Sequence, residues 1–260
     1  MIPDLKAKLL AGQPAVGCWL ELMSPIAAEI VGQAGYDCVL IDMEHGAASY
    51  GDAIAMMQAV AASGTAPLIR VPFNDPVALK RALDTGVSGV MIPGIDNSAE
   101  AEAAVTASHY PPRGKRGMAP SIIRASGYGR HWQDYIREIG EKLLVICQIE
   151  SAEAVAQIDQ IAAVEGVDML FIGPFDLSAS FGHVGEPDHP EALEAIAKVE
   201  AAAKAAGRLL GSIPTAARPI ESLISAGHRL ILPDVDSLML RNGASDGVAR
   251  WRALVGDASA

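Results

Sequence analysis

Short apolar runs alternate with longer, alanine-rich amphipathic segments along nearly the whole chain, and this alternation restricts the possible folds more than any other feature. Eight runs have the length and composition of buried strands: residues 16–21, 38–42, 67–71, 89–92, 143–150, 169–172, 209–212 and 229–232. The main segments with helical periodicity are residues 24–34, 52–62, 76–85, 98–108, 152–161, 190–206, 216–226 and 236–254. Strands that alternate with helices form parallel sheets covered by helices.

Eight strand–helix repeats predict an α/β fold of one kind, a closed (β/α)8 barrel (TIM barrel) formed by a single domain over residues 1–260. An open, doubly wound sheet usually carries a glycine-rich dinucleotide loop after its first strand, and residues 20–24 do not form one. The one long irregular stretch, residues 110–140, is rich in Pro, Gly and Arg. We expect this stretch to be a lid or binding loop near the active-site face.

Composition narrows the classes of protein further. Half of the 260 residues are hydrophobic, and the formal net charge is −11. An acidic surface argues against nucleic acid or an anionic membrane as a partner, because both attract basic surfaces. The first residues lack a signal-peptide core, and no uncharged apolar stretch reaches the roughly 18 residues of a membrane span. Cys18, Cys38 and Cys147 lie inside apolar runs, which predicts free thiols and a cytoplasmic protein.

Polar residues gather where the predicted strands end. Active sites of (β/α)8 barrels form at this C-terminal end of the strands. The positions there are Glu21, Asp42, Glu44, His45, Arg70, Gln148, Glu150, Asp176, Ser212 and Asp234. So dense a set at one rim predicts a catalytic or binding site.

Glu150 and Asp176 are the candidate metal ligands, because each closes an apolar run. On consecutive parallel strands the two carboxylates would meet at one rim, where they offer the hard oxygen ligands that suit Mg²⁺ or Mn²⁺. The simpler interpretation is that each stabilises the start of a following helix. Gln148 shares the strand phase of Glu150 and points to the same mouth, which favours the metal site. Two protein ligands leave the coordination sphere open, as catalysis requires.

His45 and Arg70 are the candidate catalytic groups. His45 follows the second predicted strand, and Asp42 could hold its imidazole ring and fix its tautomer, as partners of general bases do. The alternatives are a loop histidine bonded to backbone and a metal ligand. Arg70 ends the third strand, where its charge needs either a neighbouring acid or a substrate oxyanion.

A short turn after the sixth predicted strand could bind the substrate, and the absence of several motifs disfavours other kinds of catalysis. Gly173, Pro174, Phe175 and Asp176 open a helical turn whose N–H groups could hold a carboxylate, and we group Gln148 and Ser212 with them as substrate-binding residues. No lysine ends a strand at this rim, so Schiff-base chemistry is disfavoured. The chain also has no nucleophile elbow and no Walker loop.

Five strings resemble the HpcH/HpaI aldolase family. They are IDMEHG at 41–46, RVP at 70–72, YPPRGKRG at 110–117, QIE at 148–150 and GPFDLSAS at 173–180. The likeness spans residues 4–250, and the last string is its most specific element.

The resemblance implies a class II aldolase that makes or cleaves 4-hydroxy-2-oxo acids, with pyruvate or hydroxypyruvate as the donor and an aldehyde as the acceptor. It implies that Glu150 and Asp176 hold Mg²⁺, Mn²⁺ or Co²⁺. It also implies that Arg70 contacts the keto oxygen, that the His45/Asp42 pair supplies the base, and that the backbone at 173–176 receives the pyruvate carboxylate.

The resemblance further implies an assembly. Similar proteins are homo-hexamers, trimers of dimers that exchange C-terminal helices, so the helix at 236–254 would leave its own barrel. Asp84 matches a residue that reaches the active site of a neighbouring subunit.

Two regions, residues 117–124 and 232–236, depart from the sugar-acid aldolases of the family. With Trp19 and Glu21 they are candidates for the acceptor pocket, so the sequence leaves the aldehyde, the stereochemistry and the preferred metal open. Alternative reactions through the same enolate are oxaloacetate decarboxylation and acyl-thioester cleavage of the citrate or malyl type. A non-catalytic barrel that binds 2-oxo acids is the alternative from another class of protein.

Overall fold

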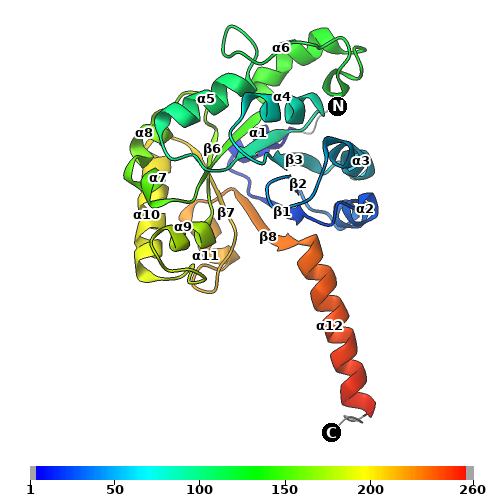
Figure 1. Cartoon of the computed structure of the whole chain (residues 1–260), viewed down its shortest axis with the longest axis vertical. Helices are drawn as coiled ribbons and strands as arrows, with labels where there is room; N and C mark the ends of the chain where they lie inside the picture. Colours follow the sequence, from blue (N-terminus) through cyan, green and yellow to red (C-terminus); the bar gives the residue numbers. More distant parts are fainter. Residues whose placement is uncertain (1–3, 256–260) are drawn as a thin grey trace.

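The computed structural model describes residues 4–255 and contains a closed barrel of eight parallel strands in sequence order (Figure 1). The strands are β1 (Ala15–Leu20), β2 (Cys38–Asp42), β3 (Ala66–Arg70), β4 (Gly89–Ile92), β5 (Leu144–Ile149), β6 (Met169–Ile172), β7 (Leu209–Ser212) and β8 (Leu230–Val235). The predicted (β/α)8 barrel is confirmed. β8 runs three residues beyond its predicted end, because it resumes pairing with β1 after an irregularity between Val16 and Cys18.

Side chains alternate along each strand between the barrel interior and the helices outside. Leu40 and Phe171 belong to the cluster that fills the barrel. Their outward-facing neighbours Val39 and Leu170 belong to the larger cluster beneath the helices. The barrel is therefore packed through its middle, and polar chemistry is confined to its two ends.

Helices surround the strands: α2 (Pro25–Gln33), α3 (Tyr50–Val60), α4 (Pro76–Asp84), α5 (Ser98–Ser108), α7 (Ala152–Ala156), α8 (Ile158–Ala163), α10 (Pro190–Ala205) and α11 (Ile220–Ala226). Several begin at side-chain caps, among them Ser24 and Asp75. The helix expected at 152–161 is two helices, because Gln157 leaves helical geometry at φ −114°. The helix expected from residue 216 starts after Pro219, which is extended.

The N-terminal end of the barrel is closed by α1 (Leu5–Leu10), which the sequence patterns did not indicate. Leu5 and Leu9 pack into the interior cluster. Lys6 Nζ lies 2.8 Å from Asp168 Oδ1 just before β6. This plug leaves the opposite end as the open mouth.

The segment 110–140 is irregular only in its first part, so the expectation of a wholly irregular loop is wrong. After a 3-10 turn, η1 (Arg124–Ser126), the chain forms α6 (Trp132–Lys142), because Tyr135 and Ile139 lie one turn apart and are buried. The expectation that this segment lies near the active-site face of the barrel to which it belongs is also wrong. Arg124 donates to the carbonyl of Thr85 at the end of α4, and Figure 1 shows α6 on the side of the N-terminus.

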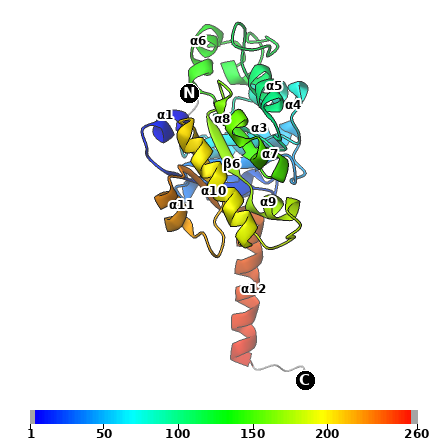
Figure 2. The ribbon, with the colours of Figure 1, turned by 90° about the vertical axis from the view of Figure 1, so that its left-hand side faces the viewer.

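The C-terminal end of the barrel carries α9 (Pro174–Ser180) and α12 (Asp236–Val255). α12 projects away from the barrel in both views (Figures 1 and 2), and Asp236 is its one buried residue within the described chain. Within residues 4–255 no helix has both the length and the apolar character that a membrane crossing needs.

Candidate active site

Strand register brings the candidate residues together at the mouth. Asp42 at the end of β2 pairs with Arg70 at the end of β3. Ile149 of β5 pairs with Ile172 of β6, so the residues that follow them, Glu150 and Gly173, leave the barrel side by side. The predicted rim is therefore one contiguous surface.

Arg70 lies at the centre of this surface and is held on three sides. Its Nε and Nη2 donate to the two carboxylate oxygens of Asp42 over 2.9 and 2.6 Å. Its Nη1 lies 3.0 Å from Glu44 Oε2. The guanidinium carbon lies 4.5 Å from the ring centroid of Trp19, a cation–π contact. A buried guanidinium with this many partners has a fixed orientation.

Asp42 positions the backbone of the His45 loop, contrary to the expected contact with the imidazole ring. Its Oδ1 accepts the N–H of Glu44 over 3.0 Å and the N–H of His45 over 3.4 Å. Both of its oxygens are engaged by Arg70, and among residues 4–255 no hydrogen bond joins Asp42 to the His45 ring. The buried Arg70–Asp42 pair thus satisfies the charge of Arg70 and fixes where His45 leaves β2.

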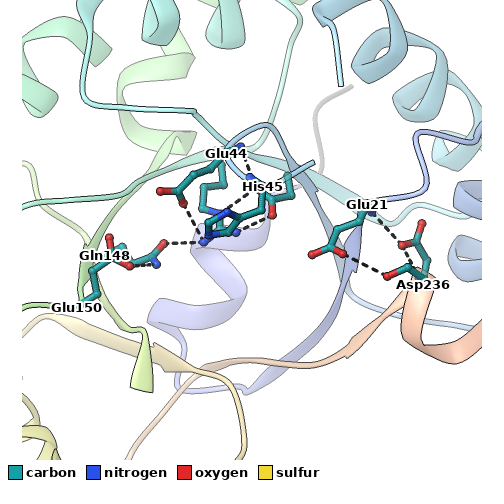
Figure 3. A network of polar contacts seen from close by, with 9 residues as sticks. Glu21, Glu44, His45, Gln148, Glu150 and Asp236 are labelled. Carbon is teal, nitrogen blue, oxygen red and sulfur yellow. Dashed lines mark hydrogen bonds and ion pairs between the residues drawn. The ribbon is translucent and has the colours of Figure 1, made fainter. Parts of the chain in front are cut away.

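Glu150 is anchored through both carboxylate oxygens. Its Oε1 accepts the N–H of Gly94 over 2.8 Å, and its Oε2 accepts from the side-chain amide of Gln148 (Figure 3). Burial raises the pKa of the Glu150 carboxyl; the Gly94 N–H opposes this, and the negative charge of Asp176 raises it further. Asp176 lies in the first turn of α9, directly after the end of β6 that pairs with β5, so the two carboxylates occupy the same part of the rim.

Neither Glu150 nor Asp176 forms an ion pair with a Lys, Arg or His in the part of the chain that the structure describes. Adjacent carboxylates that lack a paired counter-charge favour a divalent cation between them. The oxygen donors of Glu150 and Asp176 therefore fit the kind of divalent metal ion that the sequence predicts.

Gly173 leaves room beside this pair. A Cβ added at Gly173 would lie 3.2 Å from Gln148 Nε2 and 3.3 Å from Glu150 Oε2, closer than ordinary packing allows. Gly173 is also the N-cap of α9, in which Phe175 and Asp176 are exposed at the first turn. A side chain at position 173 would therefore press on the side chains of Gln148 and Glu150, which would have to shift by a few tenths of an ångström.

The remaining predicted site residues are Ser212 and Asp84, and they lie at different ends of the barrel. Ser212 ends β7, and its hydroxyl donates to the carbonyl of Ile172 over 3.1 Å. Asp84 ends α4 at the opposite end of the barrel, where Arg116 Nη2 lies 2.8 Å from its Oδ1. Asp84 is therefore not part of the mouth of its own barrel.

A second polar network joins the end of β1 to the start of α12 (Figure 3). Asp236 accepts the N–H groups of Glu21 and Leu22 over 2.9 and 3.2 Å. The hydroxyl of Ser237 donates to Glu21 Oε2 over 3.2 Å. The Tyr36 hydroxyl donates to Asp234 over 2.7 Å. These bonds fix the direction in which α12 leaves the barrel.

Two contributors to the site are not evident from sequence reasoning. Trp19 supports Arg70 from inside the barrel rather than simply lining an acceptor pocket. The N–H of Gly94 holds Glu150, and its one sequence signal is the Pro93-Gly94 pair directly after β4. Both act through spatial neighbours that lie far away in the chain.

A closed (β/α)8 barrel with charged side chains gathered at the C-terminal ends of its strands has the architecture of a (β/α)8-barrel enzyme. A family model described as HpcH/HpaI aldolase/citrate lyase matches residues 15–242, and the chain belongs to this family. Enzymes of this family are metal-dependent.

The individual relatives agree with the family model. The pyruvate aldolase of Rhizobium etli is 41% identical over 254 residues, 96% of this chain and 98% of that protein. The 4-hydroxy-2-oxo-heptane-1,7-dioate aldolase of Shigella sonnei is 40% identical over 254 residues, 96% of this chain and 95% of that protein. A solved HpcH/HpaI aldolase/citrate lyase family protein from Burkholderia cenocepacia J2315 has a TM-score of 0.90 at 38% identity, covering 96% of this chain and 99% of the other. The resemblance identified in the sequence is confirmed.

Proposed function

We propose that the protein is a class II aldolase that reversibly cleaves 4-hydroxy-2-oxo acids into pyruvate or hydroxypyruvate and an aldehyde. The observation that carries the proposal is the pair of Glu150 and Asp176, which has no ionic partner among residues 4–255, at the same mouth as the fixed guanidinium of Arg70. The names of the relatives, which are aldolases, support the same chemistry.

Mg²⁺, Mn²⁺ or Co²⁺ held by Glu150 and Asp176 would supply Lewis-acid stabilisation of the negative charge that develops on the 2-oxo acid. Arg70 acts on the same charge. A guanidinium has five N–H donors; Asp42 takes two, and Gln148 and Glu44 take one each, which leaves one N–H of Nη2 for the keto oxygen. Because Arg70 is already oriented, no reorganisation is needed when cleavage of the C3–C4 bond leaves an enolate.

Proton transfer is assigned to His45, which removes the C4 hydroxyl proton, directly or through a water molecule, in the cleavage direction. In the synthetic direction the same imidazole returns a proton to the new alkoxide. The pyruvate carboxylate is assigned to the turn Gly173–Asp176, with Pro174 and Phe175 between them and with Gln148 and Ser212 at the edges of the pocket.

The test is a panel of aldehydes with pyruvate and hydroxypyruvate as donors, run with and without a chelator. We expect condensation with at least one aldehyde, an approximately 10³-fold loss in chelator, and recovery with Mg²⁺, Mn²⁺ or Co²⁺. Oxaloacetate and a malyl thioester are assayed alongside. Turnover of only these two would replace the aldolase assignment, and full activity in excess chelator would remove the metal from the proposal.

We further propose that α12 is exchanged between two subunits within a homo-hexamer. α12 carries an apolar stripe in which Leu240, Val248, Trp251 and Leu254 recur at helical spacing. All four are exposed, Trp251 by 64% and Leu254 by 83%. A long apolar stripe that its own barrel leaves uncovered needs a partner surface.

The barrel offers a complementary gap. β8 and β1 are neighbours, with α11 and α2 on their two sides, and in a complete barrel the last helix would cover their outer face. Here Val16 of β1, Ile26 and Ile30 of α2, and Ile224 of α11 are exposed. α12 of a second copy would cover these side chains. In such an assembly Asp84 is available to a neighbouring subunit, because it lies away from its own mouth.

We expect the wild-type protein to be a hexamer by light scattering after size exclusion. Trp251→Glu is expected to dissociate the dimers and to lower activity, because a charge replaces the largest apolar side chain of the stripe. Arg250→Ser is the matched control, because Arg250 is exposed on the same helix but lies outside the stripe. This variant is expected to form an assembly of the same mass as the wild-type protein. A monomeric wild-type protein, or an assembly that tolerates Trp251→Glu, would contradict the exchange.

We assign the protein to the cytoplasm. Cys18, Cys38 and Cys147 are free and buried. Burial raises the pKa of the Cys18 and Cys147 thiols to about 12, so both are protonated and unreactive at neutral pH. Burial also raises the pKa of the Cys38 thiol, and three protonated thiols fit a compartment in which disulfides do not form.

A further inference from the structure

The segment between α9 and α10 holds a cluster of metal-binding side chains that the aldolase reaction does not use. Within residues 4–255, His183, His189 and Glu191 are the one group of three or more His, Cys, Asp or Glu residues whose ligand atoms all lie within 4.8 Å of one another. None of the three belongs to the Glu150/Asp176 site. This separate cluster we call the His–His–Glu cluster.

The three side chains contact one another directly. His183 Nε2 lies 2.9 Å from Glu191 Oε2. The rings of His183 and His189 are stacked, with centroids 3.4 Å apart and an angle of 19° between their planes. His189 Nδ1 accepts the backbone N–H of Glu191 over 3.3 Å at the start of α10. One imidazole thus contacts the carboxylate and the other contacts its backbone.

The backbone that carries the cluster is already ordered. His183 N–H donates to the carbonyl of Ser178 over 2.9 Å, and His189 N–H donates to the carbonyl of Glu186 over 3.0 Å. Asp188, next to His189, accepts the N–H of Ala217 over 3.0 Å and so ties the segment to the loop after β7. The backbone therefore needs little reordering when an ion binds, whereas one imidazole must turn out of the stack so that a nitrogen of each ring points at the same ion.

The ligand set selects the kind of ion. Two imidazoles and one carboxylate are the donors that Zn²⁺ and neighbouring transition-metal ions prefer, whereas Mg²⁺ prefers oxygen ligands alone. Three protein ligands leave a fourth tetrahedral position for water. All three residues are half-buried or exposed, so the ion can reach them from solvent.

We propose that the His–His–Glu cluster binds one Zn²⁺-type ion, independently of the metal at Glu150 and Asp176. The ion takes the place of the hydrogen-bonded proton between His183 Nε2 and Glu191 Oε2. It also competes with the long hydrogen bond that the backbone N–H of Glu191 donates to His189 Nδ1. Because the segment continues from α9, whose first turn contains Asp176, the bound ion braces the connection between α9 and α10 at the mouth of the barrel (Figure 2).

The experiment uses the full chain with the other site removed, as the double variant Glu150→Gln/Asp176→Asn. Titration with Zn²⁺ in a calorimeter is expected to show one bound ion, insensitive to millimolar Mg²⁺. Adding His183→Ala is expected to weaken binding at least tenfold. His189→Asn, which keeps an acceptor for the helix cap, is expected to do the same. His131→Ala removes an exposed histidine elsewhere and is expected to leave binding unchanged.

Co²⁺ gives a second readout. Bound at the cluster, it is expected to produce the visible absorption of a tetrahedral N/O site, which His183→Ala abolishes. Thermal denaturation without metal verifies that each variant is folded. If the double variant binds no Zn²⁺, or binds it equally well after His183→Ala and His189→Asn, the cluster is only a helix cap with an ion pair and the proposal is overturned.

Discussion

Replacing Glu150 with glutamine is expected to lower the rate of aldol cleavage about 10³-fold without unfolding the barrel. Glutamine has nearly the same volume and keeps an oxygen for the N–H of Gly94; its –NH2 group replaces the oxygen that accepts from Gln148, and Gln148 restores that hydrogen bond by turning its own amide over. It removes the negative charge that a divalent cation needs. Asp176 alone, which is exposed, would then hold the ion weakly.

The same substitution is expected to leave the unfolding temperature of the metal-free protein unchanged or slightly higher. Burial raises the pKa of the Glu150 carboxyl, which means that its charged form is disfavoured in the folded chain. A neutral amide avoids this cost. Loss of activity together with retained stability is the result expected of a ligand, and a structural helix cap would show the opposite pattern.

Steady-state kinetics at the metal concentration that just saturates the wild-type enzyme and calorimetric metal titration check this prediction. Glu153→Gln is the matched control, because Glu153 is an exposed glutamate in the first turn of the next helix, α7. It should keep wild-type activity and metal affinity. A Glu150→Gln enzyme that retains more than about a tenth of the wild-type rate would be incompatible with ligation by this residue.

The barrel could be predicted from the sequence because its signals are local. The strands at 38–42, 89–92, 169–172 and 209–212 match their predicted bounds, since each is an apolar run between turn residues. α6 could not be seen in the same way. The Pro, Gly and Arg content of the residues before it dominates the composition of 110–140, and only the pair Tyr135 and Ile139 marks the buried face of the helix.

The site could be predicted as a set of residues but not as a network. Carboxylates at the ends of consecutive strands must meet at one rim, which follows from topology alone. The partner of Arg70 does not follow, because several acids end strands nearby. The strand register places Asp42 opposite Arg70 and so determines which acid pairs with the arginine. Because Asp42 accepts from Arg70, it does not bond the ring of His45. The position of Asp84 at the far end does follow, since each helix runs back along the barrel to the start of the next strand.

The second large effect is expected from Arg70→Ala, which should abolish activity and also lower the free energy of unfolding by about 3–5 kcal/mol. Asp42 is fully buried, and without Arg70 its charge has no ionic partner. Glu44 loses its ion pair as well. For a chain of this size, each kcal/mol corresponds to roughly 2–4 °C in the midpoint of thermal unfolding, so the shift is readily measured at a fixed scan rate.

Three further variants separate stability from catalysis. Arg113→Ala breaks an exposed ion pair with Glu141 and should cost less than about 1 kcal/mol. Arg70→Lys keeps the charge but loses the planar fork, so it should recover part of the stability and little of the activity. The double variant Asp42→Asn/Arg70→Met removes both buried charges and should regain stability while remaining inactive. If the double variant were active, Arg70 would serve only to neutralise Asp42, and stabilisation of the enolate would have to come from elsewhere in the mouth.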